Sequence, residues 1–165
     1  MPNENERKWI VNKALNEIIP ENGGSHIIQP YLSVSENGEV RLRRREYPGG
    51  KVQLTICVKR GKGQNREEVA TPIMSRHFNQ LRKAAVEKVR KTRYEIPLSS
   101  WTIKKWNEKI MELDVYEGDL EGLVVAEIED PPSGVDQEIP NGWEEVTRDE
   151  RYKNKWLATE GRPES

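Results

Sequence analysis

The chain has 165 residues, which is enough for one domain with a single buried core. Its 27 lysines and arginines nearly balance 28 aspartates and glutamates, while the single Cys57 excludes a disulfide within the chain. There is no N-terminal apolar signal segment and no run of 18 apolar residues, so we expect a soluble cytoplasmic protein without a membrane partner.

Eight segments alternate between polar and apolar residues, which is the pattern of half-buried β-strands. In chain order they are ENERKWIV (4–11), HIIQPYLSV (26–34), VRLRRRE (40–46), KVQLTICVK (51–59), REEVATPI (66–73), VRKTRYEIPL (89–98), IMELDVYEG (110–118) and VVAEIED (124–130). Turn residues at ENG (36–38), PGG (48–50) and GKG (61–63) separate some of them. The pattern predicts an antiparallel sheet of eight strands.

Helices are expected beside this sheet, giving a mainly antiparallel β fold with flanking helices (α+β). We predict a helix over Ser75–Lys88 with Ser75 as its N-cap, because Phe78, Leu81, Ala85 and Val89 trace an apolar stripe. Shorter helices are expected near 12–19 and after Asp149. Residues 1–158 would form one domain, and 159–165 a disordered C-terminal tail.

The polar faces of the eight strands carry equal numbers of acids and bases. The acids are Glu4, Glu6, Glu68, Glu95, Glu112, Asp114, Glu127 and Glu129, and the bases are Lys8, Arg41, Arg43, Arg45, Lys59, Arg66, Lys91 and Arg93. An eight-stranded antiparallel sheet tends to close and so remove its edges, which predicts a closed β-barrel. If helices cover the apolar face from outside, the charged face lines an interior that must hold water, ions or a ligand.

The charges are also segregated along the chain. Residues 38–95 contain sixteen bases and six acids, a net charge of +10, whereas residues 112–150 contain one base and fourteen acids, a net charge of −13. Arginine and lysine together hold the oxygens of a phosphate chain, and clustered carboxylates suit Mg²⁺ or Mn²⁺. Because basic and acidic residues occur together on matching faces of the strands, the pattern favours a metal-assisted polyphosphate site. Nucleic-acid binding through RLRRR (41–45) is the simpler competing interpretation of the basic face.

Other catalytic signatures are absent from the sequence. It contains no G-x-S-x-G, no phosphate-binding loop ending in Gly-Lys-Ser/Thr and no H-E-x-x-H motif. His26 and His77 have no partner residue at metal-ligand spacing, so we expect them at the surface rather than in a site.

The order of the motifs resembles that of the CYTH superfamily, also called the triphosphate tunnel metalloenzymes. NENERKWIV carries the E-x-E-x-K signature, and the match continues through QPYL (29–32), VRLR (40–43), LTICVKRGKG (54–63), REE (66–68), KTRY (91–94), LDVYEG (113–118), AEIE (126–129) and EVTRDERYKN (145–154). The resemblance implies an eight-stranded antiparallel tunnel that holds a triphosphate chain with Mg²⁺ or Mn²⁺.

Residue roles follow from the same resemblance. Glu4, Glu6, Glu127 and Glu129 would bind metal, with Asp114 and Glu68 as supporting ligands. Lys8, Arg41, Arg43, Lys59 and Arg93 would bind phosphate, joined by Lys91 and Arg151. Tyr31 would be a proton acceptor, and Lys8 and Lys59 would act with it in catalysis. Two departures from the family pattern are Ala70, where many members carry a second acid, and the shortened segment PPSGVDQEIPNGW (131–143).

We therefore expect a metal-dependent hydrolase of inorganic triphosphate. The alternatives left open are class IV adenylate cyclase or a nucleoside or thiamine triphosphatase of the same fold, and a polyphosphate-binding module without turnover. The inferred lining is almost wholly charged, with Tyr31 and Tyr116 facing in and Trp9 and Tyr94 facing away, so a bare phosphate chain should be preferred over ATP. The sequence does not decide whether the chain forms a homodimer.

Overall fold

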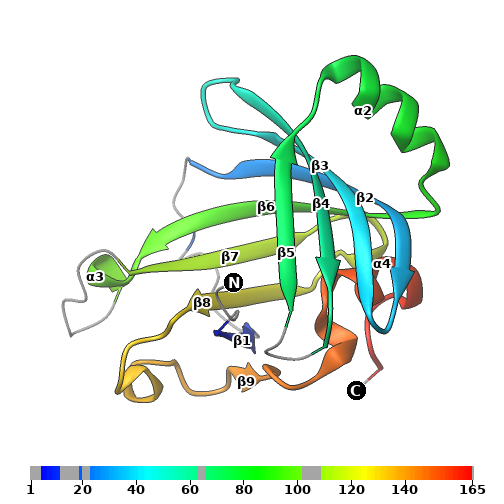
Figure 1. Cartoon of the computed structure of the whole chain (residues 1–165). Helices are drawn as coiled ribbons and strands as arrows, with labels where there is room; N and C mark the ends of the chain where they lie inside the picture. Colours follow the sequence, from blue (N-terminus) through cyan, green and yellow to red (C-terminus); the bar gives the residue numbers. More distant parts are fainter. Residues whose placement is uncertain (1–4, 12–18, 20–22, 63–65, 102–108, 165) are drawn as a thin grey trace.

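The computed structural model describes residues 5–11, 19, 23–62, 66–101 and 109–164, and Figure 1 shows their arrangement. Within these residues nine strands form one antiparallel sheet in the order β5-β4-β3-β2-β6-β7-β8-β1-β9. The strands are β1 (Glu6–Ile10), β2 (Ser25–Ser35), β3 (Gly38–Glu46), β4 (Val52–Arg60), β5 (Glu67–Pro72), β6 (Glu87–Pro97), β7 (Ile110–Tyr116), β8 (Val124–Glu129) and β9 (Glu144–Glu145). The α-helices are α2 (Ser75–Leu81), α3 (Leu98–Trp101) and α4 (Asn154–Glu160), and the 3-10 helices are η1 (Arg82–Ala84), η2 (Gly118–Leu120), η3 (Val135–Gln137) and η4 (Glu150–Tyr152).

All eight predicted strands are present, as β1 to β8, and each is antiparallel to its neighbours. The ninth strand, β9, was not predicted. It has two residues, which pair with Trp9 and Ile10 of β1. A two-residue strand contains no alternation, so periodicity could not have revealed it.

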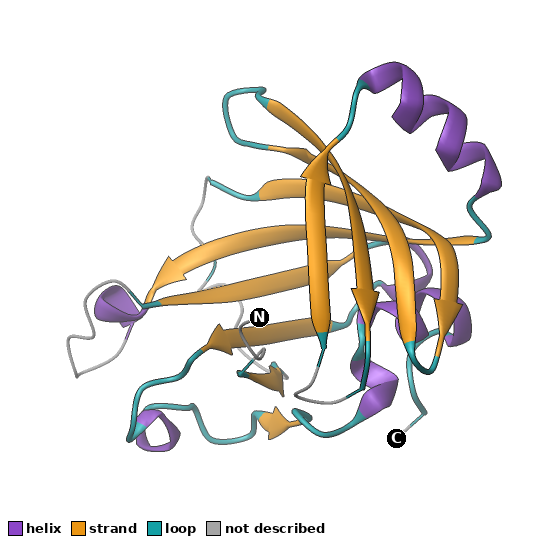
Figure 2. Ribbon diagram, viewed as in Figure 1, coloured by secondary structure: helices purple, strands orange, loops and turns teal. Residues whose placement is uncertain are grey.

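The predicted closed eight-stranded barrel is wrong, because the sheet is open between its two end strands, β5 and β9. Figure 2 shows a strongly curved sheet whose end strands do not join. Two features oppose closure. All six residues of β5 are exposed. They include the charged Glu67 and Glu68, and also Pro72, which has no N–H to donate to another strand. On the other side β9 already occupies part of the outer edge of β1.

The predicted helix over Ser75–Lys88 is too long. Helix α2 ends at Leu81, η1 follows, and β6 has begun by Glu87. Phe78 is the buried residue of α2, whereas Val89 belongs to β6, so the expected stripe spans two different elements. Ser75 is the first helical residue rather than the cap, a position that Met74 takes with extended backbone.

The sequence predicts two further helices, one near 12–19 and one after Asp149. Residues 12–18 of the segment near 12–19 lie outside the described residues. The helix expected after Asp149 is confirmed as η4 and α4, and α4 runs through Thr159 to Glu160. No helix among the described residues has the length and apolar character needed to span a bilayer.

The core lies mainly behind the second half of the sheet. Trp9, Ile96, Leu113 and Ala126 are buried there beneath the connection that contains Val135, and Trp143 packs against the same cluster. The prediction that Trp9 faces away from the charged face is therefore confirmed. A second cluster, around Val89, Leu123 and Leu157, joins α4 to the sheet.

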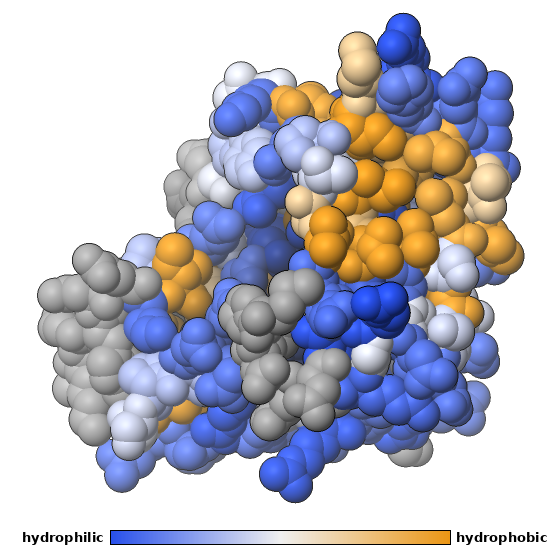
Figure 3. Space-filling model, viewed as in Figure 1, coloured by the Kyte–Doolittle hydropathy of each residue, from blue (hydrophilic) through white to orange (hydrophobic). Residues whose placement is uncertain are grey.

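The outer face of the first half of the sheet is less well covered. Figure 3 shows apolar side chains gathered over β4, β5 and α2, on a surface that is otherwise largely hydrophilic. Val58, Val69 and Met74 contribute to the exposed apolar surface, each more than two-fifths exposed. Both apolar faces point away from the charged face, which is thus left to line the concave side of the sheet.

Candidate active site

A cavity of about 300 Å³ lies on the concave side of the sheet. Its lining is almost entirely charged and comes from seven strands, the residue before β5 and the start of α4. The lining residues are Glu6, Lys8, Glu39, Arg41, Arg43, Lys59, Arg66, Glu68, Arg93, Glu112, Glu127, Glu129, Lys153 and Asn154. Twelve of these fourteen lie in the strands or beside them, so the alternation of the strands produces most of the site.

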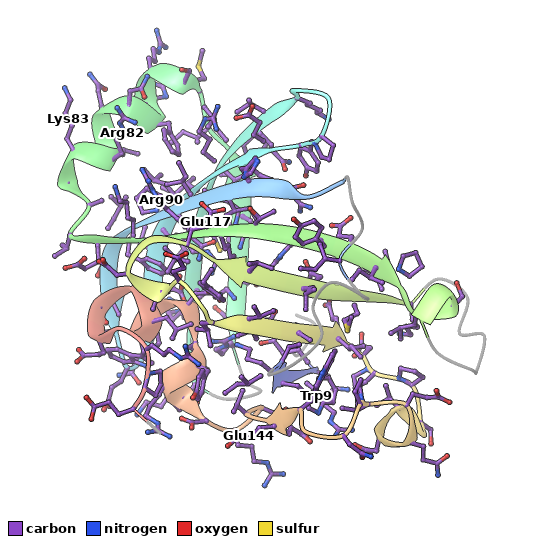
Figure 4. All side chains as sticks on the ribbon, turned by 180° about the vertical axis from the view of Figure 1, so that it is seen from behind. Trp9, Arg82, Lys83, Arg90, Glu117 and Glu144 are labelled. Carbon is purple, nitrogen blue, oxygen red and sulfur yellow. The ribbon has the colours of Figure 1, made fainter. Side chains whose placement is uncertain are left out.

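Strand β3 illustrates this alternation. Arg41 and Arg43 line the cavity, whereas Arg44 between them lines a separate groove with Arg82 and Arg90. Arg82 and Arg90 are labelled in Figure 4, near α2 and the sheet, while Trp9 and Glu144 mark the opposite end. The predicted orientation of these β3 side chains is thus confirmed.

Basic residues of the first half of the sheet form one side of the cavity, which we call the basic wall: Arg41, Arg43, Lys59 and Arg66. Arg41 contacts Glu39 at 3.4 Å and Glu68 at 4.0 Å, and Lys59 contacts Glu68 at 3.5 Å. Glu68 therefore lies among cations rather than with the other acids. Burial lowers the pKa of Arg43 to about 10, and the neighbouring charges of Arg41 and Arg93 add to this effect.

Asp114 is the centre of a buried ion-pair network below the cavity. Arg93 donates to both of its oxygens, from Nε at 2.7 Å and from Nη2 at 2.8 Å, while Lys91 Nζ donates at 2.7 Å. Burial alone would favour the neutral acid, but Arg93 and Lys91 outweigh it and hold the pKa of Asp114 below its usual range. This network fixes Arg93, whose Nη1 also donates to Glu112 at 2.6 Å.

Lys91 is fully enclosed in this network. Burial lowers its pKa to about 8, because the attraction of Asp114 is offset by the nearby charges of Arg93 and Arg43. Its Nζ also donates to Asn154 Oδ1 at 3.3 Å. Neither Lys91 nor Asp114 is among the residues that line the cavity.

Carboxylates of β1, β7 and β8 form the opposite side, which we call the acidic wall: Glu6, Glu112, Glu127 and Glu129. The strand register places Glu6 directly opposite Glu129, and Glu112 directly opposite Glu127. Lys8 lies within this wall, with its Nζ 3.2 Å from Glu127. Burial raises the pKa of Glu112, and the negative charges of Asp114 and Glu127 contribute to the same effect despite the opposing charge of Arg93.

The chemistry of the acidic wall suits a hard divalent cation. Carboxylate oxygens are the donors that Mg²⁺ and Mn²⁺ prefer, and opposed carboxylates on neighbouring strands repel one another unless a cation lies near them. Among the described residues, no three His, Cys, Asp or Glu side chains converge on a single point. Glu4 lies outside the described residues. Metal binding by Glu4, Glu6, Glu127 and Glu129, supported by Glu68 and Asp114, stays a prediction.

Two residues that were predicted to belong to the site, Tyr31 and Arg151, do not line the cavity. Tyr31 is buried below the basic wall, and burial raises its pKa to about 12, so its hydroxyl keeps its proton at neutral pH. Its role as a proton acceptor stays a prediction. Arg151 is exposed and makes two hydrogen bonds to Asp149, at 2.9 and 2.7 Å, away from the cavity lining.

Several lining residues were not assigned a role from the sequence. Glu39 shares the alternation phase of Arg41, so it could have been found by that signal, and Arg66 and Glu112 were counted on the charged faces without a role. Lys153 and Asn154 enter from α4, and Asn154 Oδ1 accepts from the Tyr116 hydroxyl at 2.6 Å. No strand pattern reports where a later helix packs.

No family model matches the chain. It is 34% identical over 163 residues to the inorganic triphosphatase of Nitrosomonas europaea, a match that covers 94% of this chain and 96% of that protein. A crystal structure of the hypothetical protein NE1496 superposes with a TM-score of 0.61 at 32% identity, covering 94% of this chain and 97% of the other. A crystal structure of the inorganic triphosphatase NE1496 gives 0.58 at 28% identity, covering 97% and 99%.

Proposed function

We propose that this chain, which belongs to the same family as the inorganic triphosphatase of Nitrosomonas europaea, hydrolyses inorganic triphosphate to pyrophosphate and phosphate with a divalent metal ion. The observation that supports this most directly is one cavity with a basic wall on one side and an acidic wall on the other. A triphosphate chain needs several cationic donors, and a metal bound to it needs carboxylates. The cavity provides both.

The basic wall would bind and orient the substrate. Arg41 and Arg43 present guanidinium groups that match phosphate oxygens in pairs, whereas Lys59 contributes a point charge. Arg93 and Lys8 lie nearer the acidic wall and would contact the part of the chain closest to the metal. Arg93 and Lys8 are each held by an ion pair before substrate arrives, so they would stabilise charge that develops in the transition state with little reorganisation.

The acidic wall would hold the metal through Glu6, Glu127 and Glu129, with Glu4 as the further predicted ligand. When bound, Mg²⁺ or Mn²⁺ would polarise a phosphoryl oxygen and support in-line attack by water. Lys8, beside Glu127, would keep part of the carboxylate charge neutralised until the metal binds. Lys8, Lys59 and Tyr31 are the residues that we propose for the catalytic step itself.

We also propose that the chain belongs to the CYTH superfamily. The support is the order of nine motifs along the sequence, and seven of these contribute at least one residue to the cavity lining. The open sheet means that this assignment rests on the motifs and on the charged concave face, not on a closed tunnel.

The direct test is a phosphate-release panel of inorganic triphosphate, ATP, thiamine triphosphate and long-chain polyphosphate. Each would be assayed with Mg²⁺, with Mn²⁺ and with a chelator. We expect the fastest release from triphosphate and none with the chelator. Tight triphosphate binding without release would instead identify a polyphosphate-binding module, and faster release from a nucleotide or thiamine triphosphate would change the substrate class.

A further inference from the structure

Gln29 is a buried amide below the basic wall that contacts two predicted site residues. Its side chain is fully enclosed in β2 between β3 and β6. Arg43 Nε donates to Gln29 Oε1 at 2.9 Å, and Gln29 Nε2 donates to the Tyr31 hydroxyl oxygen at 2.6 Å. A buried amide with both ends engaged has one orientation available to it.

The direction of this chain of hydrogen bonds follows from the donors involved. Arginine can only donate, so the oxygen of Gln29 must face Arg43 and the nitrogen must face Tyr31. The hydrogen bond from Nε, the guanidinium nitrogen attached to the side-chain stem, fixes the orientation of Arg43. The two terminal nitrogens of Arg43 are then left for the cavity, which Arg43 lines.

The cations around the cavity differ in how they are compensated. Arg41 is 3.4 Å from Glu39, Arg93 is bound to Asp114 at 2.7 Å, and Lys8 is 3.2 Å from Glu127. In the part of the chain that the structure describes, Arg43 forms no ion pair, and its side-chain partner is the neutral Gln29. The charge of Arg43 is therefore available to an anion in the cavity.

We infer that Gln29 is a positioning residue for triphosphate, holding Arg43 toward the substrate without neutralising it. This inference rests on the proposed function and names a residue that acts through Arg43. A carboxylate in its place would hold Arg43 equally well but would cancel its charge. An apolar side chain of similar length would leave the charge but release the guanidinium.

Two variants separate these effects. Gln29→Glu keeps the size of the side chain and an acceptor for Arg43, while Tyr31 can turn its hydroxyl to donate. Gln29→Met keeps the length and removes both hydrogen bonds. The matched control is Gln53→Met, because Gln53 accepts from the Tyr47 hydroxyl at 3.1 Å in an exposed pair outside the cavity lining.

Triphosphate binding would be measured by calorimetry without metal, and kcat and KM with metal, in the full chain. We expect Gln29→Glu to weaken binding and raise KM by about tenfold or more, with a smaller fall in kcat. Gln29→Met should raise KM and lower kcat together, because Arg43 is no longer oriented toward the bound substrate or the transition state. The control, Gln53→Met, should remain within about twofold of the wild type in triphosphate binding, kcat and KM.

A double-mutant cycle with Arg43→Ala distinguishes positioning from general damage. If Gln29 acts through Arg43, adding Gln29→Glu to Arg43→Ala should change KM by less than about twofold. An undiminished effect in that background, or wild-type binding by both folded Gln29 variants, would overturn the inference. Wild-type protein that neither binds nor cleaves triphosphate would overturn the proposed function itself.

Discussion

Glu6 of β1 and Glu129 of β8 are directly opposite each other in the sheet, and both line the cavity. Two like charges in such a cross-strand pair destabilise a sheet by a modest amount. The pair therefore acts against folding stability unless a cation lies close to it. A divalent cation bound by both carboxylates, as proposed above, would remove this repulsion.

Glu129→Gln should abolish most metal-dependent hydrolysis, because loss of one carboxylate ligand removes several kcal/mol, or about a hundredfold or more in rate. Without metal, the variant should be at least as stable as the wild type, since the repulsion with Glu6 is relieved. Phosphate release as a function of Mn²⁺ concentration and thermal melting with a chelator check the two parts.

The matched control for that change is Glu95→Gln. Glu95 was counted on the charged faces, but it pairs with Arg45 at 3.0 Å and does not line the cavity. Its loss should leave hydrolysis close to the wild-type rate. A wild-type rate in Glu129→Gln would contradict the metal assignment.

Arg43→Ala should raise KM and lower kcat for triphosphate, because the ground state and the transition state both depend on this cation. Arg44→Ala removes the neighbouring arginine, which is 2.9 Å from Glu46 and lines a different groove. That variant should behave like the wild type in steady-state kinetics. Similar damage from both changes would mean that the register of β3 is wrong.

The pH dependence of hydrolysis should report on Lys91. Its pKa is lowered to about 8 by burial, so it loses its proton as the pH rises through that value. The site then loses one positive charge, and kcat/KM for triphosphate should fall on the alkaline side. The pH profiles of kcat/KM for the wild type and for Lys91→Met, measured on both sides of pH 8, test whether Lys91 causes the fall. The alkaline fall should be missing in the variant, and an identical fall in both would assign it to another group.

The sequence predicted the strands well because their polar and apolar residues alternate, and it predicted most of the cavity lining for the same reason. Glu6, Arg41, Lys59 and Glu127 are brought together as expected. Periodicity reports which face a side chain occupies, but not how far the sheet curves or whether its ends pair. The closed barrel was therefore an error that the alternation could not prevent.

The remaining differences have similar causes. Asp114 and Lys91 have the expected phase, but the network with Arg93 keeps both below the cavity surface, and ion-pair partners cannot be read from alternation. Gln29 carried no charge and so was not assigned to the site, although its phase matches that of Tyr31. Asn154 depends on the packing of α4, which is a tertiary contact without a local signal.

The charged lining of the cavity suits a bare phosphate chain. Among the described residues that line it, none is aromatic, because Tyr31 and Tyr116 are buried beneath the surface. A nucleotide base would therefore lack a stacking partner there. The deciding measurement is kcat/KM for inorganic triphosphate and for ATP, with chromatography of the ATP products. Triphosphate should be cleaved at least about tenfold more efficiently, a difference of about 1.4 kcal/mol in transition-state binding, and no cyclic AMP should form. Equal efficiency, or any cyclic AMP, would contradict a site that prefers a bare phosphate chain.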